Sequence, residues 1–587
     1  PNYSSRNKSN ISRIITFGTK DEDNIRLDLI YFVKNSQYLK NIYHIGKNVI
    51  ISGKFESFNG LGQIVHPDYV TTLSKKKDIP KIETIYPLFM GVNQKFITKI
   101  VHEAINNIPN IKEWLSEEII QKLKLPRWKD AIKQIHLPQN ISDTHVDSIF
   151  RKRLALDELV ANQISMLIIK KKISKKNEIN KQNINFDLVN KFYKRLPFTL
   201  TNNQEKVINE ISHDIKSNDT MIRMLQGDVG SGKTIVALIS MLTSISDGSQ
   251  SVLLVPTEIL AIQHYNTIKE LTKHLDLEIV LLLGESKATE SKKERSEIIK
   301  KISEGSIKII IGTHALISKK IIYKNLSLAV IDEQHRFGVK QRVEITDKGD
   351  NVNVLVMTAT PIPRSLALTA YGDMDISTIT EKPKGRKEIK TYVMPQNKIN
   401  EVIVSINRAI ENDALVYWVC PLIEESENLD LIAVNDRFEF LKNCFKDYNI
   451  SLVHGKQNKI DRENSINDFK QGRSKILVAT TVIEVGVDIP DATIMVIECA
   501  ERFGLAQIHQ LRGRVGRSEK ESSCILLYKS ELTPISHSRL KILKETNDGF
   551  AISENDLILR GPGEILGSKQ SGNINFKFAD LHYHSDL

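Results

Sequence analysis

The sequence lacks any apolar stretch close to the ~20 residues that a helix needs to span a bilayer. Its first residues, Pro1 to Arg6, have no apolar core of the kind that marks a signal peptide. The 4 cysteines show no Cys-x-x-Cys spacing, so a zinc-ligand pattern is missing and reduced core thiols are expected. We therefore expect a protein that stays in the cytoplasm and holds no structural metal.

The chain is long and moderately basic. Its 587 residues are enough for several domains, and 41% hydrophobic with 26% charged residues is ordinary for a globular protein. The net charge of +11 favours a polyanionic partner through counterion release. This is weak evidence, since biased coding composition also produces Lys- and Asn-rich surfaces.

A phosphate-binding loop is the strongest motif. The pattern G-x-x-x-x-G-K-[ST] is matched by Gly227, Asp228, Val229, Gly230, Ser231, Gly232, Lys233 and Thr234. Its glycines let backbone N–H groups surround an anion, Lys233 reaches the β- and γ-phosphates of ATP, and the Thr234 hydroxyl ligates Mg²⁺. A strand over 221–225 and a helix over 235–244 are expected around the loop.

Two acids follow another strand pattern, later in the chain. The apolar run 328–331 delivers Asp332 and Glu333 at its carboxyl end, where open α/β sheets place their ligand sites. Asp332 is expected to hold the Mg²⁺ and Glu333 to orient or deprotonate the attacking water. A solvated strand end is the alternative, and the upstream phosphate loop makes it the weaker one.

Arginines in the second half of the chain complete the set. The segment 510–517 reads Gln-Leu-Arg-Gly-Arg-Val-Gly-Arg, and guanidinium groups suit the spread negative charge of a transferring phosphoryl group. Arg514 and Arg517, three residues apart, are expected on one helical face, with Gly513 and Gly516 allowing close approach. A basic, solvated helix is the alternative.

These segments resemble superfamily-2 helicases, and more narrowly the bacterial RecG family of branch-migrating DNA helicases. The resemblance implies that Phe198 and Gln204 read adenine and that Gly486 and Asp488 lie near the ATP. It implies DNA contacts for Pro256, Thr257, Thr313, His314, Thr480 and Thr481. It also implies coupling roles for His335, Thr358, Thr360, Arg560 and Gln570. The related transcription-repair coupling factor is far longer, and its acidic motif normally lacks the histidine found here at 335.

The predicted fold is multidomain. Residues 1–73 show short β-type runs (25–32, 48–55 and 61–65) with a hairpin signal at Asn59-Gly60, which fits an OB-type β-barrel. By resemblance this is the RecG wedge, with Phe32 and Tyr38 stacking on unpaired bases, although aromatic residues in a small barrel are more often core. A helical linker (74–190), two α/β RecA-like lobes with parallel sheets (191–384 and 385–535) and a translocation-motif region (536–587) follow.

The resemblance implies an enzyme that uses ATP and Mg²⁺ to remodel branched double-stranded DNA at stalled forks and Holliday junctions. It implies a nucleoid-associated monomer, with single-stranded DNA-binding protein as a further partner. Both ends look shortened relative to the family, since the chain starts at Pro1 and stops soon after the translocation motif. A branched-DNA-binding remnant with weak or uncoupled ATPase therefore stays open as the alternative. An RNA helicase is disfavoured, because by resemblance the wedge and translocation motif belong to double-stranded DNA machinery.

Overall fold

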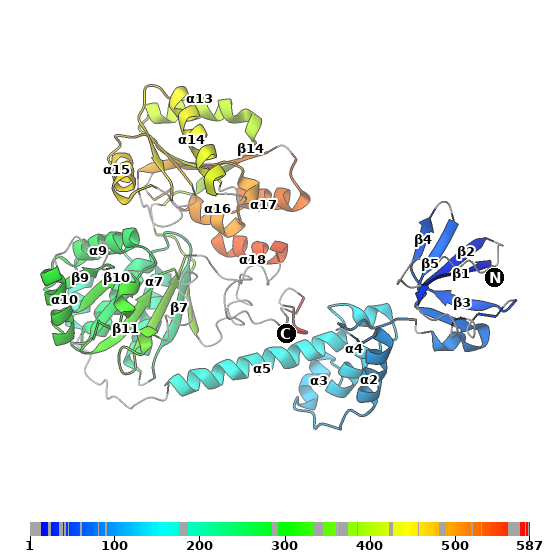
Figure 1. Ribbon diagram of the computed structural model, residues 1–587. Helices are drawn as coiled ribbons and strands as arrows, with labels where there is room; N and C mark the ends of the chain where they lie inside the picture. Colours follow the sequence, from blue (N-terminus) through cyan, green and yellow to red (C-terminus); the bar gives the residue numbers. More distant parts are fainter. Residues whose placement is uncertain are drawn as a thin grey trace. The chain divides into compact units, whose positions relative to one another are not determined.

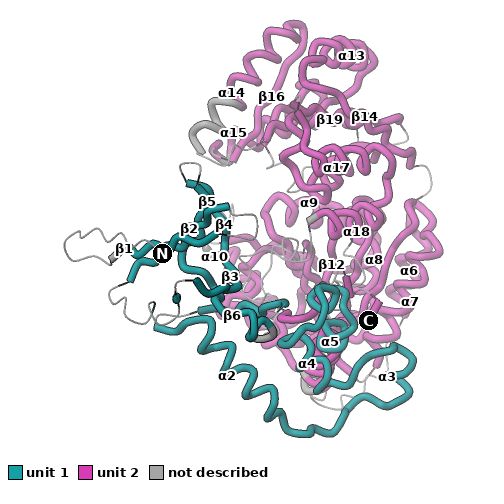
Figure 2. Tube along the Cα trace, turned by 90° about the vertical axis from the view of Figure 1, so that its right-hand side faces the viewer, with its two compact units in different colours: residues 1–154 teal, residues 155–587 magenta. Residues whose placement is uncertain are grey.

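A computed structural model places most of the chain. It describes residues 13–20, 25–33, 39, 43–44, 46–58, 61–79, 81–88, 91–174, 186–217, 219–284, 292–333, 344–359, 361, 374–383, 386–421, 427–455, 457–480, 489, 491–517, 520–529, 531–560, 576–580, 583–584 and 586–587. The chain divides into two compact units, residues 1–154 and 155–587 (Figure 2). Within the described residues, no helix combines the length and apolar character needed to cross a membrane.

The first unit begins with a β-region. One sheet has the order β1-β2-β5-β4, from β1 (Arg13–Lys20), β2 (Arg26–Val33), β5 (Leu61–Val65) and β4 (Phe55–Phe58). A second sheet pairs β3 (Val49–Ser52) with β6 (Tyr69–Thr72). The antiparallel β4–β5 pair confirms the predicted hairpin, whose Asn59-Gly60 turn lies outside the described residues. Over the described strands these are two separate sheets and not one closed barrel.

The strand expected over 48–55 is wrong in one respect, because the chain divides it between the two sheets. The division falls at Gly53, where an added Cβ would lie 2.7 Å from Ile64 Cγ2 and 3.2 Å from Pro67 Cα. Only glycine permits this approach, so the backbone can bend and send β4 away from β3.

Helices follow in the first unit. They are η1 (Leu73–Asp78), α2 (Gln94–Asn106), α3 (Glu117–Leu123), α4 (Trp128–His136), η2 (Ile141–Thr144) and the start of α5 (Ile149–Ser174). Side-chain caps begin α2 and α3: Asn93 accepts from Phe96 N–H, and Ser116 accepts from Ile119 N–H.

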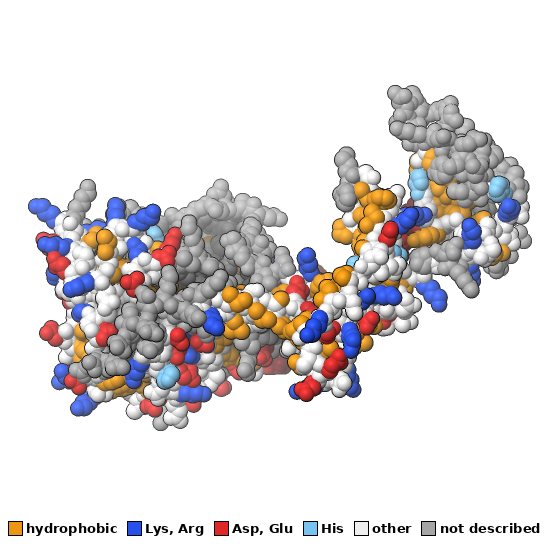
Figure 3. Space-filling view, turned by 90° about the horizontal axis from the view of Figure 1, so that it is seen from below, with side chains coloured by type: hydrophobic (Ala, Val, Ile, Leu, Met, Phe, Trp, Pro, Cys, Tyr) orange, Lys and Arg blue, Asp and Glu red, His pale blue; other side chains and the backbone are white. Residues whose placement is uncertain are grey.

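Helix α5 is long and carries apolar side chains on its surface. It lies within residues 74–190, for which the sequence predicts a helical linker. Ile164, Leu167 and Ile168, at the spacing of one helical face, are 50%, 57% and 52% exposed. Figure 3 shows hydrophobic side chains gathered along this helix.

The second unit contains the first motor lobe, a parallel sheet with the order β13-β7-β12-β11-β8-β10-β9. Its strands are β7 (Ile222–Gly227), β8 (Gln250–Leu254), β9 (Ile279–Leu282), β10 (Ile309–Gly312), β11 (Leu326–Ile331), β12 (Asn353–Thr358) and β13 (Asp375–Ile379). Its helices are α6 (Asp187–Tyr193), α7 (Asn202–Lys216), α8 (Lys233–Ile245), α9 (Glu258–Thr272), α10 (Lys292–Glu304) and the 3₁₀ turn η3 (His314–Ile317). The predicted parallel α/β lobe is confirmed (Figure 1).

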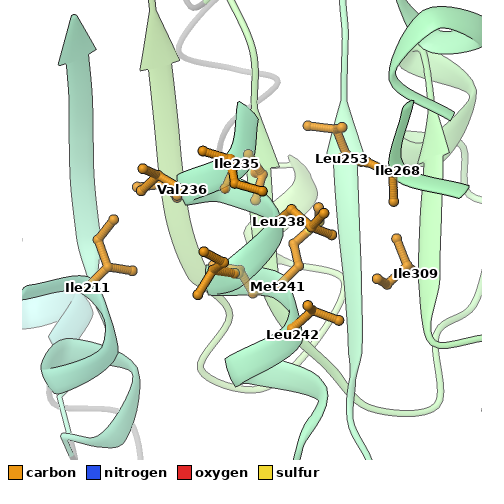
Figure 4. Close-up of a cluster of buried hydrophobic side chains, with 14 of the residues drawn as sticks. Ile211, Ile235, Val236, Leu238, Met241, Leu242, Leu253, Ile268 and Ile309 are labelled. Atoms are coloured by element: carbon orange, nitrogen blue, oxygen red, sulfur yellow. The ribbon is translucent and has the colours of Figure 1, made fainter. Parts of the chain in front are cut away.

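Helix α8 is buried because its sequence is apolar on almost every side. Every residue from Ile235 to Ile245 is buried. Figure 4 shows Leu238, Met241 and Leu242 of α8 in the cluster that includes Leu253 of β8 and Ile309 of β10. This packing fixes the end of α8 that carries Lys233 against the sheet.

The second lobe is another parallel sheet, with the order β14-β19-β18-β15-β17-β16. Its strands are β14 (Ile389–Pro395), β15 (Leu415–Val419), β16 (Ile450–Val453), β17 (Ile476–Ala479), β18 (Ala492–Ile497) and β19 (Ser522–Tyr528). The remaining elements are η5 (Gln396–Lys398), α13 (Ile399–Glu411), α14 (Glu427–Cys444), α15 (Lys459–Lys470), η7 (Ala500–Arg502), α16 (Leu505–Arg512), α17 (Pro534–Glu545) and α18 (Gly549–Arg560).

The C-terminal segment returns to helix α5. The Glu158 carboxylate accepts hydrogen bonds from three consecutive backbone N–H groups: Lys577 at 2.7 Å, Phe578 at 2.8 Å and Ala579 at 3.0 Å. A carboxylate that satisfies three amides fixes both the path and the direction of the segment it binds.

Candidate active site

The phosphate loop has the geometry expected from its sequence. It runs from the end of β7 to the first turn of α8, with Gly230 at φ +73° and Gly232 at φ +85°. Lys233 Nζ donates to the carbonyl oxygens of Gly227 (2.8 Å) and Asp228 (2.9 Å). Burial lowers the pKa of the Lys233 ammonium, and the Glu333 and Asp332 carboxylates partly offset that effect. The ammonium therefore lies inside its own loop, at the N-terminus of α8, a position that favours an anion.

The paired acids lie at the carboxyl end of β11, as predicted. Asp332 N–H donates to the Leu254 carbonyl of β8, which fixes the strand end. Glu333 adopts φ +55°, a conformation unusual for any residue but glycine, and its N–H donates to Asp332 Oδ1 at 3.1 Å. Such backbone strain persists where the surrounding structure holds a residue in place, and it is concentrated at active sites.

His264 of α9 contacts the first of these acids. Its Nε2 lies 3.0 Å from Asp332 Oδ2. Burial alone would raise the pKa of Asp332. The hydrogen bond and charge of His264, together with the charge of Lys233, outweigh that effect, so the pKa of Asp332 lies below its ordinary value. Asp332 is thereby kept as a carboxylate, the form that ligates a divalent cation.

The arginines lie on a loop, and the prediction that they share a helical face is wrong. Helix α16 ends at Arg512, and Gly516 adopts φ +73°, which an α-helix does not tolerate. Arg517 Nε donates to the Gly513 carbonyl at 3.3 Å, so the loop folds back on itself. Arg514 and Arg517 therefore reach the site from an irregular turn, which we call the arginine loop (513–517).

One cavity collects these groups. It has a volume of about 310 Å³, at the small end of the range for ligand sites. Its lining comes from both lobes: Val229, Gly230, Gly232, Lys233, Thr234, Pro256, Leu260, Gln263, His264, Thr267, Asp332, Glu333, Ala359, Gln510, Arg514 and Arg517.

This donor set fits a nucleoside triphosphate with Mg²⁺. An ammonium and two guanidinium groups match a polyphosphate, while a hydroxyl and a carboxylate match the oxygen ligands that Mg²⁺ prefers. The glycines at 230 and 232 leave backbone N–H groups unobstructed by side chains.

Helix α9 supplies cavity residues that sequence reasoning missed. Leu260, Gln263, His264 and Thr267 all line the cavity. Their i, i+3, i+4, i+7 spacing is that of one helical face. The sequence carries this signal as a helical period that follows Pro256 and Thr257.

The two residues assigned to adenine recognition occupy different environments. Gln204 of α7 is 3% exposed, and its Nε2 donates to the Ser231 carbonyl at 2.9 Å. Phe198 is 48% exposed. Gln204 thus touches the phosphate loop directly, whereas Phe198 presents an open ring.

The first-lobe residues assigned to DNA contact are spread over two strand ends. Pro256 lines the cavity, and the Thr257 hydroxyl caps α9 by accepting from Leu260 N–H. Thr313 is buried after β10, and His314 is exposed at the start of η3. His314 is therefore the most accessible of the four.

Several remaining candidates are only partly placed. Thr480 is buried directly after β17, and Thr358 is buried at the end of β12. Arg560 ends α18, with its side chain outside the described part. The candidates that lie outside the described residues are Tyr38, His335, Thr360, Thr481, Gly486, Asp488 and Gln570.

Of the two aromatic residues predicted to stack on bases, the structure describes Phe32. Its side chain is 47% exposed at the end of β2, and its backbone N–H donates to His66 Nε2 at 3.1 Å. Tyr31, its neighbour, is buried with Phe17 and Tyr43. The alternation of the strand thus turns Phe32 away from that core.

The chain is similar to known helicases over its full length. Family models match at residues 201–369 (DEAD/DEAH box helicase), 395–519 (helicase conserved C-terminal domain) and 546–587 (ATP-dependent DNA helicase RecG, domain 3, C-terminal). It is 40% identical to an ATP-dependent DNA helicase RecG of Aquifex aeolicus over 95% of this chain and 72% of that protein. It is 42% identical to the RecG of Thermotoga maritima over 93% of this chain and 69% of that protein. A solved structure of RecG bound to a three-way DNA junction matches with a TM-score of 0.67 and 36% identity, over 100% of this chain and 76% of that one.

Proposed function

The chain belongs to the RecG family of ATP-dependent DNA helicases and is itself an ATP-dependent DNA helicase. We propose that it remodels branched DNA at stalled forks and Holliday junctions, and that the residues assigned below carry out this function. The observation that carries the assignment is the cavity that the phosphate loop, the paired acids and the arginine loop line together. A site made by two lobes changes shape when the lobes move, which is what a nucleotide-driven motor requires.

The roles follow from the chemistry of each side chain. Lys233 binds the β- and γ-phosphates, and Thr234 and Asp332 are the protein ligands for Mg²⁺, which neutralises phosphate charge. Glu333 orients the attacking water. Arg514 and Arg517 stabilise the charge that spreads over the transferring phosphoryl group.

Contacts of α18 support a link between this site and the translocation region. An added Cβ at Gly549, the first residue of α18, would lie 2.8 Å from His509 Nε2 and 3.1 Å from both Asp228 Oδ1 and Pro361 Cγ. Ser553, one turn later, donates its hydroxyl to the Pro361 carbonyl. Helix α18, which ends at Arg560, thus packs against both lobes next to the phosphate loop.

The β-region of the first unit is proposed to bind the branch point. Phe32 offers an exposed aromatic ring, and aromatic rings stack on unpaired bases at about 1–3 kcal/mol each. The match to a RecG structure solved on a three-way DNA junction supports a branched partner. We further propose that the chain acts as a monomer and meets single-stranded DNA-binding protein at forks.

Steady-state ATPase measurements test this function. The chain is assayed without DNA, with linear duplex and with a three-way junction, beside Lys233→Ala and Phe32→Ala variants. We expect strong stimulation by the junction, loss of turnover in Lys233→Ala, and a junction response in Phe32→Ala that falls toward that of duplex.

Two outcomes would count against the proposal. Turnover that ignores DNA would identify a branched-DNA-binding remnant with uncoupled ATPase. Equal stimulation by duplex and junction in the unmodified chain would remove the role assigned to Phe32.

A further inference from the structure

Arg386 bridges the phosphate loop of the first lobe and the arginine loop of the second. Its Nη1 donates to the Val229 carbonyl at 2.8 Å, and its Nε donates to the Gly516 carbonyl at 2.8 Å. Both acceptors are backbone groups of loops that line the ATP cavity, whereas Arg386 itself is not part of the cavity lining. One guanidinium thus joins the two loops from outside the nucleotide site.

Glycines make this close approach possible. An added Cβ at Gly230 would lie 1.9 Å from Arg386 Nη1, and one at Gly513 would lie 2.6 Å from Val229 Cβ. A side chain at either position would force Arg386 or Val229 to move. The glycines of both motifs therefore have a steric role between the lobes as well as a role toward phosphate.

Asp228, the residue before Val229, also contacts the second lobe through His509. Asp228 Oδ1 lies 2.5 Å from His509 Nε2 of α16, and Lys382 Nζ lies 3.8 Å from Asp228 Oδ2. Burial alone would raise the pKa of Asp228. The hydrogen bond and charge of His509 and the charge of Lys382 outweigh that effect, so the pKa of Asp228 lies below its ordinary value. A charged carboxylate and a neighbouring carbonyl of one loop are thus both bound by groups outside the ATP cavity.

These contacts continue away from the nucleotide. Arg512 Nη2 lies 2.8 Å from His509 Nδ1, and Arg512 Nη1 donates to the carbonyls of Leu543 (2.8 Å) and Thr546 (3.0 Å) at the end of α17. Two side chains, His509 and Arg512, thus connect Asp228 to the end of α17.

We propose that Arg386 is a positioning residue of the ATPase cycle, which couples the phosphate loop to the arginine loop by holding Val229 and Gly516 together. Gly516 directly precedes Arg517, which lines the cavity. A shift of the Val229 carbonyl on nucleotide binding must either carry Gly516 with it or break the Arg386 bridge. While the bridge holds, the position of Arg517 depends on the phosphate loop through Arg386.

The arginine fork suits this role better than a lysine. The planar guanidinium directs Nε and Nη1 toward two different acceptors at fixed geometry, whereas an ammonium is a point charge on a flexible stem. Each bond from a charged donor is stronger than one between neutral groups. A lysine at 386 should keep the charge but lose one of the two contacts.

The test compares Arg386→Ala and Arg386→Lys with Lys387→Ala, which removes the same charge from the next, exposed residue. We expect Arg386→Ala to lower junction-stimulated kcat at least about tenfold, because the arginine loop loses its registration with the phosphate loop. Binding of a non-hydrolysable ATP analogue should weaken less than about threefold, since the guanidinium does not line the cavity. Arg386→Lys should lie between, and Lys387→Ala should stay within about twofold of the unmodified chain.

An unchanged kcat in Arg386→Ala, or an equal loss in Lys387→Ala, would overturn the proposal. If Arg386→Ala fails to fold, Arg386→Lys becomes the deciding variant. A kcat in Arg386→Lys equal to that of the unmodified chain would then overturn the proposal.

The kcat test rests on the proposed function, since it requires a DNA-stimulated ATPase. A second measurement does not depend on turnover. Spin labels on the exposed native Cys444 of α14 and on Lys300→Cys of α10 report the distance between the lobes. The bridge predicts that Arg386→Ala broadens this distance distribution and that Lys387→Ala does not. If DNA fails to stimulate the unmodified chain, the proposed function fails while this measurement still decides the role of Arg386.

Discussion

The side-chain amide of Gln204 donates a hydrogen bond of 2.9 Å to the carbonyl oxygen of Ser231, so helix α7 is bound directly to the phosphate loop. The other end of the same amide accepts from Thr201 N–H, also at 2.9 Å, as part of the capping box that begins α7. The orientation of the amide is thereby fixed from both sides, and the loop inherits the rigidity of a capped helix.

Replacing Gln204 by Glu should therefore weaken ATP binding, because the change disturbs the phosphate loop as well as the adenine contact that the resemblance implies for this residue. The new oxygen would face the Ser231 carbonyl, and a buried acceptor without a donor costs about 1–3 kcal/mol. We expect the KM for ATP to rise about tenfold or more. Asn202→Asp, the same chemical change at an exposed position of α7, is the matched control. A KM within about twofold of the unmodified chain in Gln204→Glu would show that the loop does not depend on this bond.

A second prediction concerns the end of helix α3. Lys124 is exposed and adopts φ +52° as the C-cap, and the next N–H, of Leu125, donates to the Ile120 carbonyl at 3.0 Å. Glycine enters this left-handed conformation without the cost of a Cβ, so Lys124→Gly should stabilise the helix end by about 0.5–1 kcal/mol.

Hydrogen exchange of the Leu125 amide measures the effect, which we expect as exchange slower by roughly two- to fivefold. Lys122→Gly, two residues earlier inside the same helix, should have the opposite sign, because glycine in a helix interior costs up to about 1 kcal/mol. Faster exchange in both variants would mean that the lysine stem at 124 contributes more than the backbone conformation costs.

Thiol reactivity gives a third prediction. Cys420, Cys499 and Cys524 are buried, and Cys444 is exposed. Burial raises the pKa of the Cys524 thiol to about 12 and also raises the pKa of Cys420 and Cys499. Because the thiolate is the reactive form, a thiol whose pKa is about 12 remains protonated and inert at pH 8.

A thiol-specific reagent at pH 8 should therefore modify a single cysteine quickly in the folded chain and all four after denaturation. Cys444→Ser should abolish the fast phase. A fast phase that survives in Cys444→Ser would reveal that a buried strand end opens on the timescale of the reaction.

The anchoring of the C-terminal segment gives a fourth prediction. Since one carboxylate accepts from the amides of Lys577, Phe578 and Ala579, Glu158→Ala should raise their hydrogen-exchange rates by at least about tenfold. Ser165→Ala, an exposed position on the same helix, should leave these rates unchanged. Unchanged protection in Glu158→Ala would mean that other groups hold the segment.

The sequence predicted the parts of the site in which function and local structure share one pattern. The phosphate loop and Asp332-Glu333 follow buried strands, so the same residues that signal chemistry also signal the fold around them. The parallel strands of both lobes were predictable for the same reason, because continuous apolar runs report burial on both faces of a sheet.

The remainder depends on contacts between distant segments. His264 meets Asp332 across 68 positions of sequence, and Arg386 meets Val229 across 157. No spacing rule connects such pairs. The prediction of one helical face for Arg514 and Arg517 was wrong because Gly516 adopts a left-handed conformation. A glycine permits this conformation, but its presence in a sequence does not predict it.

The place of β7 in its sheet also has a consequence for the synthesis of the protein. Both neighbours of β7, β12 and β13, lie later in the chain, and β13 ends roughly 150 residues after the phosphate loop begins. At about 5–20 residues per second, a ribosome needs on the order of 10 to 30 s to make that intervening stretch. For most of this interval, until β12 has been made, the strand that carries the ATP-binding loop has neither of its hydrogen-bonding neighbours. The nascent first lobe is thus most in need of a chaperone between the emergence of β7 and that of β12.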